Sequence, residues 1–331
     1  MGVMFSLIAV VLLILLAVVS AGFAGGRYLF GVVLPYLAMA TFIVGVIYRV
    51  VKWGRSAVPF RIPTTCGQQK TLPWIKADNL ESPHNIWGVA GRMFLEVLFF
   101  RSLFRNTRAK VTEEPRLLYA PTKWLWAAGL AFHWSFLIIF IRHFKYFAEP
   151  VPSWIVTLQE LDGFFQIGLP IILATDIVIV AAVTFLLMRR LVDQKVRYIS
   201  LPADFFPLFL LLGITLSGIL MRYFTKTDLV SIKALGTGLL SFSPVVPDGV
   251  GVTFFVHLFL VTILMAYFPF SKLMHFAGVF MSPTRNLANN NRARRHINPW
   301  DYPVKVHTYE EYEDEFRDVM KAAGLPVKEE E

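Results

Sequence analysis

The chain has 331 residues, of which 56% are hydrophobic, and its mean hydropathy is +0.56. A soluble globule of this length could not hide so many apolar side chains, so we expect lipid to solvate much of the protein. The net charge is +9, but the basic residues collect between apolar runs, as in loops that face anionic lipid, which argues against nucleic acid as a partner. The single cysteine, Cys66, excludes an internal disulfide framework and an iron–sulfur cluster held by this chain alone.

Six stretches are long and apolar enough to cross a lipid bilayer. They are residues 3–23, 30–51, 124–147, 164–188, 203–224 and 251–275. The first lacks the basic start of a signal peptide, so we interpret it as a retained anchor helix.

The orientation follows from the basic residues in the connecting segments. Segments 52–123, 189–203 and 271–331 hold 12, 4 and 9 of the 32 Lys and Arg residues, whereas the opposite side holds six. The positive-inside rule therefore predicts a multi-pass protein of the cytoplasmic membrane with both termini in the cytoplasm.

These patterns predict an all-α integral membrane protein in four parts. Two transmembrane helices occupy residues 1–51, and a cytoplasmic loop follows at 52–123. A transmembrane bundle of four helices spans 124–275, and 276–331 form a cytoplasmic tail. The bundle is the part that we expect to carry the function.

The cytoplasmic loop contains a further apolar segment, residues 86–104. Arg92, Glu96 and Arg101 interrupt it, and charges at the centre of a span are costly. We therefore expect an amphipathic helix that lies in the membrane interface with its charges hydrated, rather than a seventh crossing.

The tail contains the segment YEEYEDEFRDVMKAAG, with an apolar helical face opposite many carboxylates. That face comprises Tyr312, Phe316, Val319 and Met320. The pattern is typical of a helix that docks on a partner protein, and a solvated helix folded over the chain's own loop is the alternative.

Four of the seven histidines fall in two predicted spans, His133 and His143 in one and His257 and His275 in the other. One such residue would most simply be a core histidine bonded to a neighbouring helix. Two on each of two helices indicate a functional site. Separations of ten and eighteen residues correspond to about 15 Å and 27 Å along a helix, so neither helix can offer both its histidines to one metal.

The two helices are expected to run antiparallel, which places His133 beside His275 near the inner surface and His143 beside His257 toward the outer side. Two imidazoles that face each other across a helix bundle suit the axial positions of a haem iron and leave no vacant position for a substrate. We therefore predict two bis-histidine haem b groups that transfer electrons.

Cationic side chains at the same depths are candidates to bind the haem propionates. Arg142, Arg222 and Lys145 are candidates on the outer side, and Lys123, Lys272 and Arg285 on the inner side. Anchoring at lipid headgroups is the alternative for most of them.

Helices two to six resemble the gamma subunit of respiratory nitrate reductase, a di-haem cytochrome b. The resemblance rests on LPYLAMATFIVG, on the spacing of His133 and His143, and on HLFLVTILMAYFPFSKLMH with its FPFS turn. It implies that His133 pairs with His275 and His143 with His257.

Nearly the whole chain is similar to the M subunit of the membrane complex associated with dissimilatory sulfite reductase. The additional matches are the first helix, the loop from IPTTCGQQKTLPWIKADNL to GRMFLEVLFFRSLFRNT, and the tail from SPTRNLANNNRARRHINPWDYPVKVHTYEEYEDEF. The resemblance implies an oxidoreductase subunit in a larger complex. It would take electrons from menaquinol and pass them to a cytoplasmic, heterodisulfide reductase-like iron–sulfur subunit.

The chain departs from its nitrate reductase relatives at the outer quinone site, where they carry a lysine and this sequence has TLQELDGFFQIG. Glu160 or Asp162 could accept the quinol proton instead. The alternative is that both are acids at a helix N-terminus, where the helix dipole favours them.

A rival hypothesis is a transporter whose histidines relay protons or bind a metal ion. It predicts a colourless protein and an internal repeat, and the sequence has no evident repeat. His84, His296 and His307 lie among polar residues outside the predicted spans and are poor candidates for haem ligands.

Overall fold

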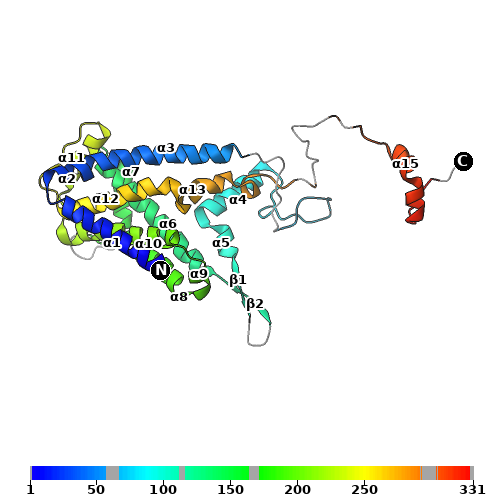
Figure 1. Ribbon diagram of the computed structural model, residues 1–331, viewed down its shortest axis with the longest axis horizontal. Coiled ribbons are helices and arrows are strands. Elements are labelled where there is room, and N and C mark those ends of the chain that lie inside the picture. Colours follow the sequence, from blue (N-terminus) through cyan, green and yellow to red (C-terminus); the bar gives the residue numbers. More distant parts are fainter. Residues whose placement is uncertain are drawn as a thin grey trace.

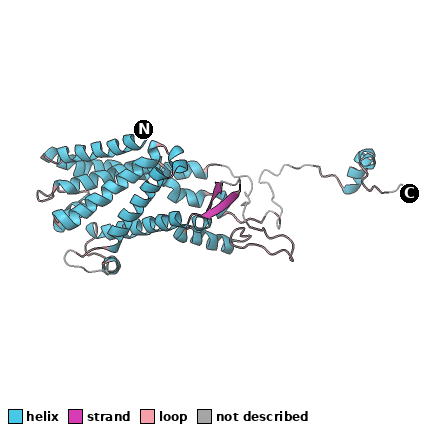
Figure 2. Cartoon of the chain, turned by 90° about the horizontal axis from the view of Figure 1, so that it is seen from below, coloured by secondary structure: helices cyan, strands magenta, loops and turns pink. Residues whose placement is uncertain are grey.

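The computed structural model describes residues 2–56, 67–111, 116–163, 171–290, 292, 303 and 305–328. Long helices lie side by side in one bundle, a two-stranded hairpin projects from one end, and a final helix stands apart (Figures 1 and 2). Cys66 and His296 lie outside the described residues.

The main helices and strands follow in chain order. They are α1 (Gly2–Ser20), α2 (Ala24–Tyr28), the π-helix η1 (Leu29–Val33), α3 (Leu34–Gly54), α4 (Ile86–Phe99), α5 (Arg101–Arg105), β1 (Thr107–Val111), β2 (Leu117–Pro121), α6 (Lys123–His143), η2 (Phe144–Tyr146), α7 (Ser153–Asp162), α8 (Ala174–Val192), α9 (Gln194–Tyr198), α10 (Pro202–Ile219), the π-helix η3 (Leu220–Thr225), α11 (Leu229–Leu240), α12 (Val252–Tyr267), η4 (Phe268–Phe270), η5 (Lys272–Met274), α13 (His275–Gly278), η6 (Val279–Met281), α14 (Pro283–Asn286) and α15 (Tyr309–Ala322).

Within the described residues, five helical segments are long and apolar enough to span a membrane. They are Gly2–Ser20, Ala24–Gly54, Lys123–Tyr146, Pro202–Thr225 and Val252–Phe270, which match five of the six predicted crossings. The sixth prediction, 164–188, corresponds in its described part to α8. That helix carries Asp176, Arg189 and Arg190 near its ends. It therefore has three charged residues, whereas the most apolar stretch of each of the other five segments has at most two.

The core of the bundle is built around α12, which packs against α3, α10 and α1, while α8 packs between α6 and α10. Phe255 and Leu260 of α12 and Leu210 of α10 are wholly buried in this core. Many other apolar side chains of the long helices are exposed, so the exterior of the bundle is hydrophobic as well.

Consecutive long helices alternate in direction. At one end of the bundle the start of α1 meets the start of α10, where the Ser6 hydroxyl donates to the main-chain oxygen of Pro202 over 2.9 Å. At the other end the Tyr36 hydroxyl of α3 donates to the main-chain oxygen of Leu239 in α11 over 2.8 Å. The ends of α3 and α13 lie together, since Gly278 packs against the ring of Trp53.

The last span ends earlier than the sequence predicts. The α-helix α12 stops at Tyr267, and short 3₁₀ turns follow through Pro269, with His275 at the start of α13. Proline has no N–H to continue the helix, and the Ser271 hydroxyl oxygen accepts from Leu273 N over 3.1 Å to begin the next turn.

The loop helix α4 forms, but its charges are bound by protein groups rather than left to water as expected. Arg92 is buried and donates to the main-chain oxygens of Glu81 over 3.0 Å and Thr284 over 2.7 Å. Glu96 forms an ion pair with Arg285 of α14. These contacts fasten α4 to the segment that follows the last span.

The tail helix α15 begins with a capping box, in which Thr308 and Glu311 bond each other's main-chain N–H groups. Its predicted apolar face carries exposed Tyr312, Phe316 and Val319. Figure 1 places this helix away from the bundle, so the described residues provide no docking partner for that face.

Candidate functional site

The structure brings the four span histidines together as two pairs. His133 of α6 lies beside His275 of α13, with ring centroids 5.9 Å apart and ring planes at 86°. His143, the last residue of α6, lies beside His257 of α12, with centroids 6.3 Å apart and planes at 12°. We call these the inner and the outer pair, after the depths that the sequence predicts for them.

The Nδ1 atom of every one of these histidines faces a main-chain oxygen. His133 bonds Gly129 O at 2.7 Å and His143 bonds Ile139 O at 2.6 Å, each one turn back on α6. A carbonyl oxygen only accepts, so each Nδ1 carries the proton and Nε2 keeps its lone pair.

The same arrangement recurs on the opposing helices. His257 Nδ1 lies 3.0 Å from Ile214 O, and His275 Nδ1 lies 2.9 Å from Lys272 O. Histidines that bind metals almost always donate their other ring N–H in this way, which fixes the tautomer and the orientation of the ring.

The separation of the rings fits one metal between each pair. Two metal–nitrogen bonds of about 2 Å each, with about 1.2 Å from each nitrogen to its ring centre, place the centroids roughly 6.4 Å apart. The observed 5.9 Å and 6.3 Å agree with this value. The described residues contain no group of three or more His, Cys, Asp or Glu that could hold a metal.

Two small residues of α10 make room for the outer pair. A Cβ atom at Gly218 would lie 3.3 Å from Cε1 of His257. Ser217 donates to Ile214 O over 2.9 Å, and its oxygen lies 3.0 Å from His257 Nδ1. Gly213, by contrast, faces Leu260 and Val10 and serves the packing of helices.

A buried ion network lies next to the outer pair. Arg142, adjacent to His143, pairs with Asp162 of α7 at 2.7 Å and with Asp176 of α8 at 2.9 Å. The Tyr223 hydroxyl donates to Asp176 over 2.8 Å. The network ties α6, α7, α8 and η3 together around the outer pair.

This outer region retains unused hydrogen-bond donors. Arg142 and Arg222 each keep an Nε that is buried and has no hydrogen-bond partner among the described residues. Arg222 lies in the π-helix η3, a distortion frequently found at functional sites. Lys145 donates to the Gln159 side chain over 2.6 Å. A bound anion would satisfy the two orphaned Nε atoms, and haem propionates have the required charge.

The predicted inner cations are engaged within the protein. Lys272 pairs with Asp204 at 2.6 Å, and Arg285 pairs with Glu96. Lys123 donates to Phe104 O over 2.5 Å and lies over the Phe104 ring. The structure therefore gives these three residues structural partners.

The two candidate proton acceptors have different environments. Asp162 is buried, and its carboxylate accepts from the N–H of Thr175 over 2.9 Å and its hydroxyl over 2.6 Å, in addition to the pair with Arg142. Glu160 is exposed on α7. Both lie at the C-terminal end of α7, but the Thr175 N–H from which Asp162 accepts belongs to the first turn of α8. Asp162 therefore lies at a helix N-terminus, as the alternative explanation requires, whereas Glu160 has no such contact among the described residues.

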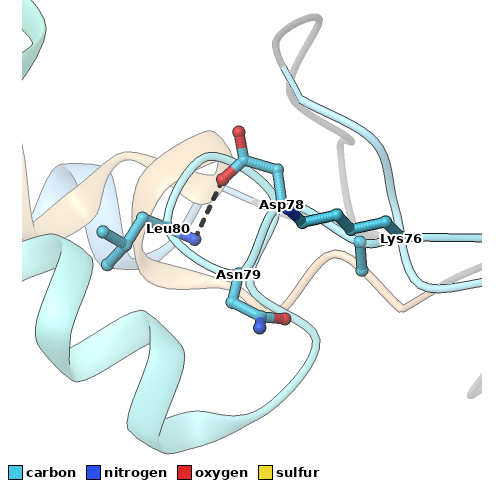
Figure 3. A pocket seen from close by; sticks show the side chains of 5 residues that line it. Lys76, Asp78, Asn79 and Leu80 are labelled. Atoms are coloured by element: carbon cyan, nitrogen blue, oxygen red, sulfur yellow. Dashed lines mark hydrogen bonds between the residues drawn. The ribbon is translucent and has the colours of Figure 1, made fainter.

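An apolar groove lies between α6 and α7, at the level of His143 but on a different face of α6, because Ile141 precedes His143 by two residues. It is lined by Ile141, Ser153, Trp154, Thr157, Leu158 and Leu161. The α7 residues recur at helical spacing and form one face of that helix. A second, shallow pocket in the loop before α4 is lined by residues 76–80 alone, where Asp78 accepts from Leu80 N over 3.2 Å (Figure 3), and it contains none of the paired histidines.

Sequence reasoning missed several residues of the site. Asp176 could have been noticed as a carboxylate inside a predicted span, but Tyr223 gives no signal without the fold. The small residues Ser217 and Gly218, in contrast, could be recognised in the sequence as leaving room for a cofactor. Of the remaining histidines, His307 faces Glu315 at 3.6 Å and His84 neighbours Asn85, so neither joins the pairs.

Comparison with known proteins identifies the family. The profile of the nitrate reductase gamma subunit matches residues 84–295, which include all four paired histidines. The chain belongs to this family.

Two curated relatives are similar to this chain over most of its length. Both are named Hdr-like menaquinol oxidoreductase cytochrome b-like subunit. The Archaeoglobus fulgidus protein is 49% identical over 280 residues, covering 82% of this chain and 83% of the relative. The Archaeoglobus profundus protein is 42% identical over 275 residues, covering 81% of each. These relatives agree with the predicted resemblance to the M subunit with a core like the nitrate reductase gamma subunit.

Proposed function

We propose that this chain is the membrane cytochrome b subunit of a menaquinol-oxidising complex, with two haem b groups held by His133 with His275 and by His143 with His257. The observation that carries the proposal is that the four histidines form two close pairs in which every Nδ1 atom bonds a main-chain oxygen, which leaves the Nε2 lone pair of each ring free for a metal. Family membership and the names of the relatives support a cytochrome b that works with menaquinol.

A haem iron held by two histidines supplies one-electron transfer with no open coordination position. The protein's contribution is to orient the imidazoles. Arg142 and Arg222 would bind the propionates of the outer haem through their unused Nε atoms. Gly218 and Ser217 fix the place and tautomer of His257.

The quinol is proposed to bind on the outer side, in the groove between α6 and α7. The groove is apolar and open to the lipid phase, as the exposed Trp154 and Leu161 indicate. Glu160 lies at the end of the same helix and is the carboxylate that remains available to accept a proton. Electrons would pass along α6 from His143 to His133, about 15 Å away in a continuous helix.

The proposal includes six crossings with both termini in the cytoplasm. The alternating direction of the helices supports α8 as the remaining span, because it lies between α6 and α10 and its 19 residues extend about 28 Å. We further propose that the inner haem delivers electrons to a cytoplasmic, heterodisulfide reductase-like iron–sulfur subunit in dissimilatory sulfite reduction. The chain alone would then be one part of an oxidoreductase.

A visible spectrum of the purified chain tests the proposal. We expect the reduced-minus-oxidised bands of low-spin haem b and two haems per chain. A colourless protein would refute the electron-transfer function and favour the transporter hypothesis. In liposomes, menaquinol oxidation on the outer side should produce a signal from a voltage-sensitive dye, and its absence would contradict the proposed direction of electron flow.

A further inference from the structure

The junction between α4 and α5 contains an unusual main-chain conformation. Phe100 has φ 51° and ψ 48°, in the left-handed region that a bulky side chain seldom adopts. Such a conformation persists only where surrounding contacts hold it, and it is found preferentially at functional sites.

Two tryptophans of α6 hold the end of α4. Trp126 Nε1 donates to Phe99 O over 2.8 Å, and Trp134 Nε1 donates to Leu98 O over 3.1 Å. Carbonyls in the last turn of a helix have no partner within it, so these indoles satisfy groups that would otherwise need water. The two tryptophans flank His133 in the sequence of α6.

Contacts on the other side of the junction fix α5 relative to α4. The Glu96 carboxylate accepts from the Ser102 N–H over 2.9 Å and from the Ser102 hydroxyl over 2.6 Å. The same carboxylate pairs with Arg285 of α14. The junction is therefore bound both to α6 and to the segment that follows His275.

These contacts place the Phe100 ring against the inner pair. Its centroid lies 4.9 Å from that of His133, with the rings edge to face at 85°. Phe132 makes a similar contact, but it precedes His133 on the same helix. Phe100 comes from a separate segment, and its position depends on the strained junction.

We propose that Phe100 is a positioning residue for His133: it fixes the plane of that imidazole and covers its side at the α4–α5 junction, where the rest of the chain leaves the ring exposed. The inference rests on the proposed haem-binding function. Water near a haem favours the more highly charged ferric form, so exclusion of water by Phe100 raises the reduction potential of the inner haem.

The test compares Phe100→Gly with Phe100→Tyr in the full chain with its haems. Glycine accepts the positive φ without cost and removes the ring, whereas tyrosine keeps the ring. We expect Phe100→Gly to lower the equilibrium constant for reduction of the inner haem about three- to tenfold, or roughly 28 to 59 mV for one electron, and to alter its electron paramagnetic resonance spectrum. Phe100→Tyr should retain the wild-type values. Phe94→Ala, on the exposed face of α4, is the matched control and should change neither haem.

The outer haem reports whether the variants are folded. An inner haem with unchanged potential and spectrum in Phe100→Gly, or a Phe100→Tyr variant as altered as Phe100→Gly, would overturn the inference. If Phe100→Gly loses both haems, Phe100→Leu replaces it in the comparison with Phe100→Tyr. Equal inner-haem spectra in these two variants would exclude a role for the aromatic ring. A wild-type chain that binds no haem would instead refute the proposed function itself.

Discussion

The rings of His143 and His257 lie within 12° of parallel, whereas those of His133 and His275 cross at 86°. Parallel axial imidazoles separate the energies of two iron d orbitals, and perpendicular imidazoles leave those orbitals nearly degenerate. We therefore predict two distinct low-spin signals in electron paramagnetic resonance, with the larger anisotropy from the inner haem. Two identical signals would contradict the geometry. His257→Ala should abolish the signal with smaller anisotropy.

Replacing one histidine of each pair should remove one haem at a time. His257→Ala and His133→Ala are each expected to lower the haem content from two per chain to one, because an iron with a single axial ligand is held weakly. His307→Ala is the control, since His307 lies in the tail facing Glu315. Quantifying haem per chain is the measurement, and full retention of haem in His257→Ala would show that the ligand assignment is wrong.

A methyl group at Gly218 should disturb the outer haem alone. Gly218→Ala would place a Cβ atom 3.3 Å from Cε1 of His257, and the neighbouring ring must move by a few tenths of an ångström. We expect a shifted potential for the outer haem and an unchanged inner haem, measured by redox titration. Gly91→Ala is the matched control, because a Cβ atom there meets nothing within 4 Å. Equal behaviour of the two variants would exclude a role for Gly218 in the site.

Substitutions of the two carboxylates of α7 should have different effects, on stability at Asp162 and on quinol oxidation at Glu160. Removing one partner of a buried ion pair typically costs about 3 to 5 kcal/mol, so Asp162→Asn should destabilise the protein by an amount of this order. Glu160 is exposed, and Glu160→Gln should leave stability unchanged but slow quinol oxidation. Denaturant unfolding in detergent and a quinol-oxidation assay measure the two effects. If Asp162→Asn is as stable as the wild type, the network does not have the structural role assigned to it.

The ion pair between Glu96 of α4 and Arg285 of α14 should weaken at low pH. Burial raises the pKa of Glu96, but hydrogen bonds from Ser102 and the charge of Arg285 outweigh burial, so the pKa lies below its ordinary 4.5. A carboxyl whose pKa is lowered by folding stabilises the protein above its unfolded pKa, and this stabilisation is lost as the pH falls through the folded value. Thermal unfolding of the wild type should therefore become easier below about pH 4.5. Glu96→Gln should lack this component of the pH dependence, whereas the exposed Glu310→Gln should keep it.

Composition and hydropathy were enough to predict a helical membrane protein, and five of the predicted spans are present as apolar helices. Spans are predictable because each needs only a run of apolar residues of sufficient length, which is a local property. The α8 segment shows the limit of that rule, since its terminal charges Asp176, Arg189 and Arg190 give a weaker local signal even though the helix packs inside the bundle.

Spacing along two antiparallel helices also predicted which histidines would lie side by side, and the structure brings the same pairs together. Their role as iron ligands stays a prediction. The sequence could not show that the main-chain oxygens of Ile214 and Lys272 accept from the Nδ1 atoms of His257 and His275. Nor could it show that Asp162 forms an ion pair with Arg142 or that Phe100 contacts His133. Except for Lys272, these partners are brought in from distant segments, so they depend on how the helices pack. The sequence by itself thus determined the long helices and the positions of the histidines along them, and only the tertiary structure decided which groups orient the imidazoles.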